Sequence, residues 1–379
     1  MDLHLSLVFK KGDIVDWPEY GKILLEKCKK NEIPFHVGFE LTPFCNFSCN
    51  MCYIRLNKKQ AEAQGKLLTT EQWIHLAEEA KSLGALSMEV TGGEAMTRPD
   101  FHILYKTFIE MGFLIVLRTN GYAIDDRTIE LLKHYKPRKV MITLYGASDR
   151  TYRKVCGIAD GFTVVTKNIL ALKDAGLNVC LSATITRENE DDIESMQEWA
   201  GRNGFYLSLC GMLFTPIRGA RRSVDHLKVR LSEDTYALSE GMKSLPREIP
   251  DRDFYMNPFW MCRAYGAKLT ITWDGKMTMC NSNPSIWKDP FSEGMGKAYH
   301  ELYSELRKIR RPKECGDCKY IDLCSVCPSM LYSATGSMER TTYEMCRIAH
   351  RKYKNQLLMT GYKAESDDQI QDNPCDEGV

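Results

Sequence analysis

The stretch Phe35-His-Val-Gly-Phe-Glu-Leu-Thr-Pro-Phe-Cys45-Asn-Phe-Ser-Cys49-Asn-Met-Cys52-Tyr53 joins a short apolar run to three closely spaced cysteines. The run Phe35–Leu41 is typical of a buried β-strand, and the cysteines follow it with the spacing C-x3-C-x2-C. Thiolates select iron–sulfur clusters, zinc or copper(I) over metals that prefer oxygen. A structural zinc site normally has four protein ligands. Three cysteines in one loop therefore favour a cubane cluster with one iron left open, with zinc or an inert loop as the alternatives.

The length and composition of the chain are typical of a globular protein and do not indicate a strongly charged binding partner. The chain has 379 residues, enough for one large domain and a smaller one, and 44% of them are hydrophobic. Its 51 basic and 50 acidic residues nearly cancel, which gives no reason to expect nucleic acid or an anionic membrane as a partner. No apolar run approaches the roughly 20 residues that span a bilayer, and the start Met1-Asp-Leu-His does not resemble a secretory signal. We therefore expect a cytoplasmic protein.

The chain contains 15 cysteines, a large number for its length, and several of them stand in tight C-x2-C groups. In a small secreted protein such cysteines would indicate disulfides. In a long chain with no export signal, metal binding in a reducing cytosol is the better interpretation.

From about residue 35 to residue 214 the sequence alternates β-rich runs with amphipathic helical patterns. The alternation predicts an α/β fold, a parallel sheet with helices outside, and its six units are too few for a closed eight-fold barrel. Between the first two runs, Thr69 and Gln72 have the spacing of a capping box at the start of a helix. The predicted strands are Phe35–Leu41, Leu86–Thr91, Leu114–Leu117, Val140–Leu144, Val179–Ile185 and Tyr206–Phe214.

Two motifs follow the first two predicted strands. The cysteine triplet comes after the first strand, and Gly92-Gly93-Glu94 comes after the second. Because ligands gather at the carboxyl ends of parallel strands, we expect both motifs on the same rim. Glycines let the backbone approach a ligand closely, and a glutamate carboxylate can accept a hydrogen bond from an ammonium group.

The last third of the chain carries a second set of cysteines. Twelve residues separate Cys262 from Gly275, and four residues separate Gly275 from Cys280. The alternating sequence around Asp274-Gly275 predicts a β-hairpin. The spacing then continues as Cys315-x2-Cys318-x5-Cys324-x2-Cys327, with Cys346 last. Taken alone, these tandem knuckles would fit zinc as well as iron–sulfur clusters.

Together these motifs resemble the radical S-adenosylmethionine (SAM) enzymes that carry a SPASM extension, over about residues 35–350. The resemblance implies a partial (β/α)6 TIM-like barrel with a C-terminal cysteine-rich SPASM domain that binds auxiliary Fe–S clusters. The expected divisions are an N-terminal extension (1–34), the barrel (35–230), a bridge (231–261), the SPASM domain (262–350) and a tail, disordered in part (351–379).

The resemblance also implies roles for individual residues. In this family SAM binds the open iron of a 4Fe–4S cluster. By the resemblance, that cluster would be held by Cys45, Cys49 and Cys52, and SAM would lie near Tyr53, Gly92, Gly93, Glu94, Thr143 and Thr184. Cys262, Cys280 and Cys327 would hold a nearer auxiliary cluster, and Cys315, Cys318, Cys324 and Cys346 an outer one.

The chain departs from the family pattern at three positions. Tyr145 replaces the usual aspartate after the fourth strand, and Cys156 stands where many relatives have an arginine before a glycine. Contacts from that segment are therefore open. Lys268 occupies a position where some relatives have a further cysteine, so the nearer auxiliary cluster is expected to have only three cysteine ligands.

The function implied is one-electron cleavage of SAM to methionine and a 5′-deoxyadenosyl radical, which abstracts hydrogen from a substrate carbon. SPASM relatives mostly act on peptides, so we expect a maturase of a ribosomally made and modified peptide (RiPP), forming a thioether or carbon–carbon crosslink. A flavodoxin- or ferredoxin-type protein would supply the electron. The residue types single out no catalytic base.

Several alternatives remain open. An anaerobic sulfatase-maturating (formylglycine-forming) enzyme would carry an aspartate directly after the second SPASM cysteine, but Asn281 follows Cys280 and cannot act as a general base. A SPASM oxidoreductase acting on a small molecule is a further possibility. A different class is an iron–sulfur electron-transfer protein or a zinc-stabilised binding module. The predicted barrel and Gly92-Gly93-Glu94 argue against that class.

Overall fold

The computed structural model describes residues 17–211, 213–216, 223–228, 252–259, 262, 265–321, 324, 326–343, 345–346 and 349–350. Residues 1–16 of the expected N-terminal extension, most of the expected bridge 231–261 and the expected tail 351–379 lie outside this range. No single helix in the described parts is long and apolar enough to cross a membrane, and the one helix pair that passes together is bent by 107°.

The core of the fold is one curved sheet with the strand order β6-β5-β4-β3-β2-β1-β7-β8. Strands β1 to β6 are parallel, β7 is parallel to β1, and β8 runs antiparallel to β7. All six predicted strands are present, although the last is shorter than predicted. The strands are β1 (His36–Glu40), β2 (Ser87–Thr91), β3 (Leu114–Thr119), β4 (Lys139–Leu144), β5 (Val179–Thr184), β6 (Leu207–Cys210), β7 (Lys268–Ile271) and β8 (Met277–Thr278).

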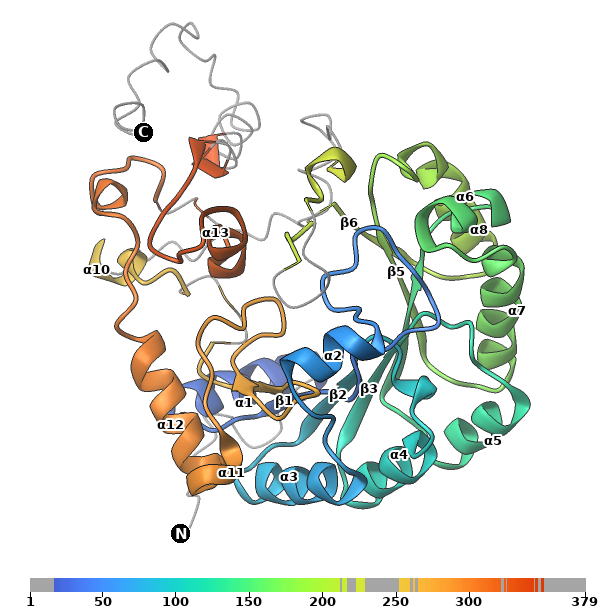
Figure 1. The fold of residues 1–379 in the computed structure, drawn as a ribbon, viewed down its shortest axis with the longest axis horizontal. Helices are drawn as coiled ribbons and strands as arrows, with labels where there is room; N and C mark the ends of the chain where they lie inside the picture. Colours follow the sequence, from blue (N-terminus) through green and yellow to red (C-terminus); the bar gives the residue numbers. More distant parts are fainter. Residues whose placement is uncertain are drawn as a thin grey trace, which may run out of the picture.

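Helices follow the outside of this curved sheet and give it the form of a partial (β/α)6 barrel (Figure 1). The outer helices are α3 (Thr70–Ser82), α4 (Phe101–Glu110), α5 (Asp126–His134), α6 (Asp149–Cys156), α7 (Gly161–Asp174) and α8 (Ile193–Arg202). The remaining helices are α1 (Trp17–Lys30), α2 (Lys58–Gln64), α10 (Arg252–Met256), α11 (Pro290–Glu293), α12 (Met295–Leu306) and α13 (Pro328–Thr335).

Local sequence signals fix where several helices begin. The predicted capping box of α3 is confirmed, because Gln72 N donates to Thr69 Oγ1 at 3.2 Å and Thr69 N donates to Gln72 Oε1 at 2.9 Å. At the start of α5, Asp125 Oδ1 accepts a hydrogen bond from Thr128 N at 2.8 Å. Such caps satisfy backbone N–H groups that have no partner inside the helix.

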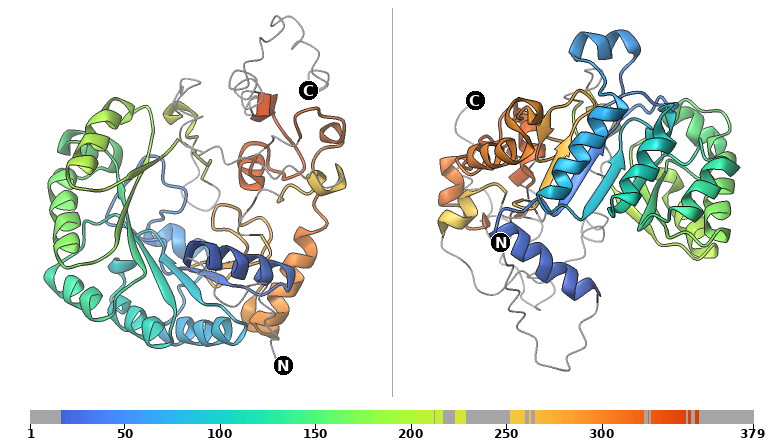
Figure 2. Two further views of the ribbon diagram at one scale, coloured as in Figure 1. Left: turned by 180° about the vertical axis from the view of Figure 1, so that it is seen from behind. Right: turned by 90° about the horizontal axis from the view of Figure 1, so that it is seen from below.

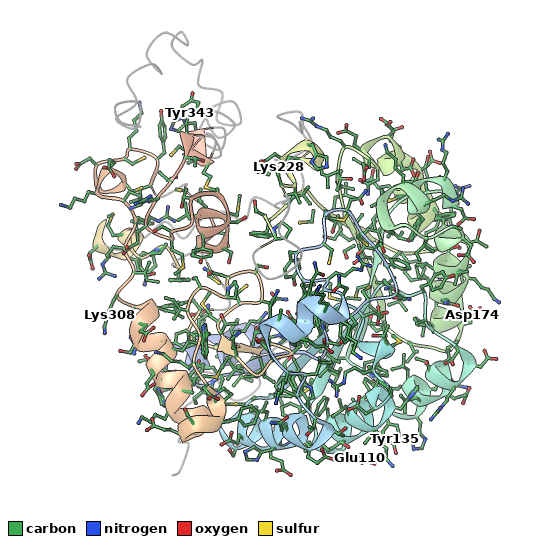
Figure 3. All side chains as sticks on the ribbon, in the orientation of Figure 1. Glu110, Tyr135, Asp174, Lys228, Lys308 and Tyr343 are labelled. Atoms are coloured by element: carbon green, nitrogen blue, oxygen red, sulfur yellow. The ribbon has the colours of Figure 1, made fainter. Side chains whose placement is uncertain are left out.

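The two faces of the sheet differ in chemistry. The face that packs against the helices is apolar in its centre. There the Phe39 ring lies 4.9 Å from the Trp73 ring and 5.5 Å from the Phe108 ring, and all three side chains are fully buried. Charged side chains such as Glu110 and Asp174 lie at the outer surface of the helices (Figure 3). Along β4 and β5 the alternate positions are only half-buried. The inside of the partial barrel is therefore more polar and more accessible than its outer side.

The C-terminal hairpin joins the barrel sheet. The predicted hairpin around Gly275 is present as β7 and β8, but β7 also pairs with β1 in the register His36↔Lys268 to Phe39↔Ile271. Helix α12 covers this junction, where Tyr303 Oη donates to Lys268 O at 2.6 Å. The strand that leads into the cysteine triplet is thus held between β2 and a strand from the C-terminal region.

One arginine ties the end of β1 to the outer helices. Arg98 Nη1 donates to Leu41 O at 3.0 Å, and Nη2 donates to Leu68 O at 3.2 Å. The same guanidinium holds Asp100 with two hydrogen bonds, of 2.8 and 2.6 Å. The Arg98 side chain is only 9% exposed, so these groups have little access to water.

Replacing Arg98 by Met should lower the free energy of unfolding by about 3 kcal/mol, because it leaves a largely buried carboxylate and two carbonyl groups without their partner. The matched control is Arg202→Ala, which removes an exposed ion pair with Glu198 and should cost less than about 0.5 kcal/mol. Urea unfolding of both variants under the same anaerobic conditions measures the difference. Equal losses would show that Arg98 is an ordinary surface residue.

Candidate functional site

The three cysteines of the triplet lie in the loop that follows β1, with their thiols free of disulfides. Cys45 Sγ accepts a hydrogen bond from Phe47 N at 3.3 Å, and Cys52 Sγ accepts one from Arg55 N at 3.3 Å. Burial raises the pKa of Cys45 to about 12, and the other two loop cysteines add to the rise. Half-buried thiols that receive backbone N–H hydrogen bonds fit an iron–sulfur cluster, whose charge such bonds stabilise.

This loop is held in place by the ends of neighbouring strands and helices. Ser48 N donates to Cys156 O at 2.8 Å and Asn50 N donates to Val155 O at 2.9 Å, which fastens the loop to the end of α6. On the other side, Asn120 Nδ2, just after β3, donates to Asn46 Oδ1 at 2.7 Å. The barrel therefore fixes the backbone of the cysteine loop from two sides.

The Gly92-Gly93-Glu94 segment lies against the cysteine loop, as the strand order predicts. Gly93 N donates to Thr42 O at 2.7 Å, and Glu94 N donates to Phe44 O at 2.8 Å. A side chain on Gly93 would place its Cβ 2.2 Å from Phe44 O, closer than atoms can come. Glycine at this position is therefore required by the contact between the two loops.

Glu94 is buried beneath these loops, with 1% of its surface exposed. Its carboxylate accepts hydrogen bonds from Thr119 Oγ1 at 2.9 Å, Asn120 N at 2.8 Å and Met96 N at 3.3 Å. Burial raises the pKa of this carboxyl. The side chain thus joins the ends of β2 and β3. Its predicted contact with the ammonium group of SAM stays a prediction, and Oε1, which has only the 3.3 Å contact, is the oxygen with more capacity to accept it.

Thr143 and Thr184 occupy half-buried positions on the inner side of neighbouring strands. Thr143 Oγ1 lies 3.5 Å from Ser182 Oγ, and the register places Ser182 opposite Thr143 across β4 and β5. Sequence reasoning missed the residue that fixes this part of the rim. Asn189 is 1% exposed, and its Nδ2 donates to Thr184 O and to Tyr145 O, each at 3.0 Å. The sequence gives little indication of this role, because it shows only that an asparagine stands between a strand and a helix.

A hydrogen bond between two described residues connects the cysteine loop to the C-terminal region. Asn281 Nδ2 donates to Tyr53 Oη at 2.9 Å, across 228 residues of sequence. Tyr53 directly follows Cys52, and Asn281 directly follows Cys280. The structure therefore brings Cys280 close to the loop of Cys45, Cys49 and Cys52, which no sequence pattern indicated.

The C-terminal cysteines lie in two groups. Burial raises the pKa of Cys327, and the Cys280 thiol adds to the rise. Burial also raises the pKa of Cys315 to about 12, and the three cysteines expected to share its cluster contribute in the same direction. Arg311, which sequence reasoning missed, is 5% exposed and donates from Nη1 to Cys324 Sγ at 3.0 Å. Among the residues described, no three His, Cys, Asp or Glu side chains are arranged to hold a metal ion.

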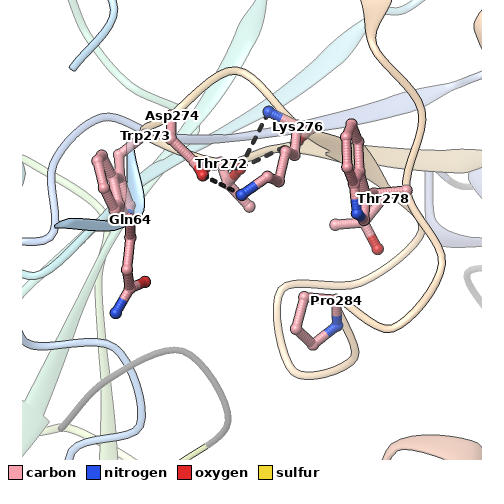
Figure 4. A pocket seen from close by; sticks show the side chains of 8 residues that line it. Gln64, Thr272, Trp273, Asp274, Lys276, Thr278 and Pro284 are labelled. Atoms are coloured by element: carbon pink, nitrogen blue, oxygen red, sulfur yellow. Dashed lines mark hydrogen bonds and ion pairs between the residues drawn. The ribbon is translucent and has the colours of Figure 1, made fainter. Parts of the chain in front are cut away.

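A pocket of about 160 Å³ lies beside the β7–β8 hairpin (Figure 4). Inside it, Lys276 Nζ lies 2.6 Å from Asp274 Oδ2 and 5.5 Å from the centre of the Trp287 ring. The pocket is lined by Gln64, Thr272, Trp273, Asp274, Lys276, Thr278, Pro284 and Trp287. None of these is a site residue predicted from the sequence.

Replacing Gly93 by Ala should displace the Phe44 carbonyl and with it the start of the cysteine loop, since the new Cβ has no space. We expect a loss of the iron bound by the first cluster and a lower stability. Gly201→Ala in α8 is the matched control, because nothing lies within 4 Å of its added Cβ. Iron analysis and unfolding of both variants test this, and full iron content in Gly93→Ala would contradict the tight contact.

Comparison with known proteins places this site in a family. Residues 39–200 match the Radical SAM superfamily. The "AdoMet-dependent heme synthase" of Methanosarcina barkeri is 23% identical over 331 residues, which cover 80% of this chain and 93% of that protein. The "sporulation killing factor maturation protein SkfB" of Bacillus subtilis is 28% identical over 296 residues, covering 76% of this chain and 69% of that protein.

Two solved structures share the fold. Streptococcus suis SuiB bound to S-adenosylmethionine is 17% identical, with a TM-score of 0.64 and coverage of 88% of this chain and 84% of that one. Native anSMEcpe with bound AdoMet is 14% identical, with a TM-score of 0.56 and coverage of 86% and 99%. With the cysteine loop, the Gly-Gly-Glu segment and the partial barrel as described, residues 39–200 match a radical SAM domain, and the chain has the fold of SPASM-type radical SAM enzymes.

Proposed function

We propose that this protein is a maturase of a ribosomally made peptide, which it modifies by forming a thioether or carbon–carbon crosslink. The observation that supports the proposal most directly is the hydrogen bond between Asn281 and Tyr53, which joins the residue after Cys280 to the residue after Cys52. Relatives named as peptide-modifying proteins support it: besides SkfB, a "PqqA peptide cyclase" of Granulibacter bethesdensis is 28% identical over 173 residues.

In this proposal Cys45, Cys49 and Cys52 hold the first cluster. When bound there and reduced, SAM supplies a carbon radical that abstracts hydrogen. The chain's own residues then bind and orient the reactants. The half-buried hydroxyls of Thr143 and Thr184 are available to bind SAM on the inner side of the sheet, and Tyr53 is fixed by Asn281 at the edge of the site. Buried apolar side chains on the helix side of the sheet, such as Phe39, keep water away from the back of the site.

The C-terminal cysteines would hold two auxiliary clusters, Cys262, Cys280 and Cys327 the nearer one and Cys315, Cys318, Cys324 and Cys346 the outer one. The grouping of their electrostatic contacts supports this division for most of them. Lys268 lies in β7, opposite His36 of β1. The nearer cluster would therefore have one position without a cysteine, where a substrate thiolate could bind.

Two features separate this proposal from the sulfatase-maturating function. Position 281 is an asparagine, which cannot act as a base. Its amide is also engaged with Tyr53, so it serves to position that ring. The electron that starts the reaction would come from a flavodoxin- or ferredoxin-type protein.

A second candidate function is oxidation of a small molecule. The relative from Methanosarcina barkeri that is named a heme synthase is covered over 93% of its length, more than any peptide-modifying relative compared above. A tetrapyrrole is therefore the small molecule to test against a peptide.

Anaerobically reconstituted protein should convert SAM to 5′-deoxyadenosine in the presence of a low-potential reductant. Replacing Cys45, Cys49 and Cys52 together by Ala should abolish this while the iron of the C-terminal cysteines remains. Cys28→Ala is the control, since this buried cysteine lies in α1 and belongs neither to the triplet nor to the C-terminal cysteines. Chromatography of the products and iron analysis measure both effects. Undiminished SAM cleavage in the triple variant would exclude this loop as the SAM site.

A short cysteine-containing peptide encoded beside this gene should lose two hydrogens when incubated with the protein, SAM and reductant. One hydrogen leaves as an atom to the adenosyl group, and the other leaves as a proton and an electron that passes to a cluster. Mass spectrometry with thiol alkylation distinguishes the products, because a thioether consumes a cysteine thiol and a carbon–carbon bond does not. Conversion of a tetrapyrrole, with the peptide unchanged, would favour the second candidate.

A further inference from the structure

Both unusual residues of the segment after β4 lie next to one cysteine of the first cluster. Tyr145 immediately follows β4, and Cys156 is the last residue of α6. The Cys49 side chain is hydrogen-bonded to both of them. Cys156 is completely buried and Cys49 is 8% exposed, so the two sulfurs meet away from solvent, and Tyr145 is half-buried beside them. Two separate departures from the family pattern thus converge on a single thiol.

The backbone fixes this arrangement. The residues on either side of Cys49, Ser48 and Asn50, donate hydrogen bonds of 2.8 and 2.9 Å to the carbonyls of Cys156 and Val155. The backbone on both sides of Cys49 is therefore held against the end of α6.

The Tyr145 ring is fixed just as firmly. It packs edge to face against the Phe47 ring, 6.2 Å away, and against the Tyr152 ring, 6.1 Å away. Asn189 in turn holds the Tyr145 carbonyl at 3.0 Å. The hydroxyl and the two sulfurs are thus presented to one another by packed structure, as a functional contact requires.

The other two cysteines of the loop are supported differently. Cys45 and Cys52 each accept a hydrogen bond of 3.3 Å from a backbone N–H group, and Cys45 accepts a longer one, of 3.6 Å, from the Asn120 side chain. Cys49 is hydrogen-bonded to two side chains, Cys156 and Tyr145, as well as to the backbone. The sequence of this chain, and not its backbone alone, therefore determines how much charge is stabilised at Cys49.

We propose that Tyr145 and Cys156 are positioning residues that set the reduction potential of the first cluster by donating two hydrogen bonds to the Cys49 thiolate. The inference rests on the proposed function, in which Cys49 is a ligand of that cluster. When the cluster accepts one electron from an external reductant, its negative charge increases by one. Hydrogen bonds to a ligand sulfur stabilise the reduced form more than the oxidised form, and so raise the potential. Both donors are neutral, so they do this without adding a net charge.

The test is an EPR-monitored redox titration of the full-length protein with its clusters reconstituted. The signal of the first cluster is identified as the one that changes when SAM is added. The variants are Tyr145→Phe and Cys156→Ala, which each remove one donor, and Cys156→Ser, which keeps a donor. Tyr122→Phe is the matched control: its ring also packs against Phe47, at 5.6 Å, but its hydroxyl donates to Asp160 at 2.9 Å.

Each donor removal should lower the ratio of reduced to oxidised first cluster at a fixed potential about threefold to tenfold, which corresponds to about 30–60 mV for a one-electron couple. The auxiliary-cluster signals should not move. Cys156→Ser should recover most of the wild-type potential, and Tyr122→Phe should match the wild type. This pattern would support the proposal.

Three results would overturn it. Unchanged potentials in Tyr145→Phe and Cys156→Ala, with full iron content, would show that the contacts only pack the loop. Loss of first-cluster iron in Cys156→Ala, but not in Tyr145→Phe, would make Cys156 a ligand and not a donor. Absence of any SAM-sensitive signal in the wild type would remove the proposed function itself, and with it this inference.

Discussion

The close approach of two backbone segments at the carboxyl ends of β1 and β2 is the constraint on which the site depends. The space between Gly93 and the Phe44 carbonyl is too small for any side chain, and the two segments exchange hydrogen bonds of 2.7 and 2.8 Å there. Two further side chains extend this contact: Glu94 connects it to β3, and Arg98 secures the residue at the end of β1. A loop built in this way has little freedom, and its three thiols are held in place by the fold.

The sequence was sufficient to predict the elements and their relation to the site. Hydrophobic runs located six strands within a few residues, and the parallel arrangement placed the cysteine triplet and the Gly-Gly-Glu segment on one rim. The last predicted strand was too long, because only Leu207–Cys210 pairs with β5 and the preceding Tyr206 is 84% exposed. A hydrophobic run does not reveal where pairing stops.

What could not be predicted are contacts between residues far apart in the sequence. The pairing of β7 with β1, the support of Cys324 by Arg311 and the hydrogen bond from Asn281 to Tyr53 all depend on how finished elements meet in space. Tyr145 and Cys156 illustrate the same limit of prediction from sequence. Each was recognised as a departure from the family pattern, but only the fold shows that both reach the Cys49 thiol. Local sequence patterns predict individual helices and strands well, but they carry no information on side-chain contacts between distant elements.

The pairing of β1 with β7 has a consequence for how the chain folds while it is synthesised on the ribosome. β1 and the cysteine triplet are synthesised early, but one neighbour of β1 is made only at residues 268–271, and the partner of Tyr53 follows at residue 281. Until then the edge of β1 lacks its final strand, and an unpaired edge strand readily pairs with other chains. During this interval the nascent protein is exposed to aggregation, and the cysteine loop lacks the hydrogen bond that Asn281 later supplies.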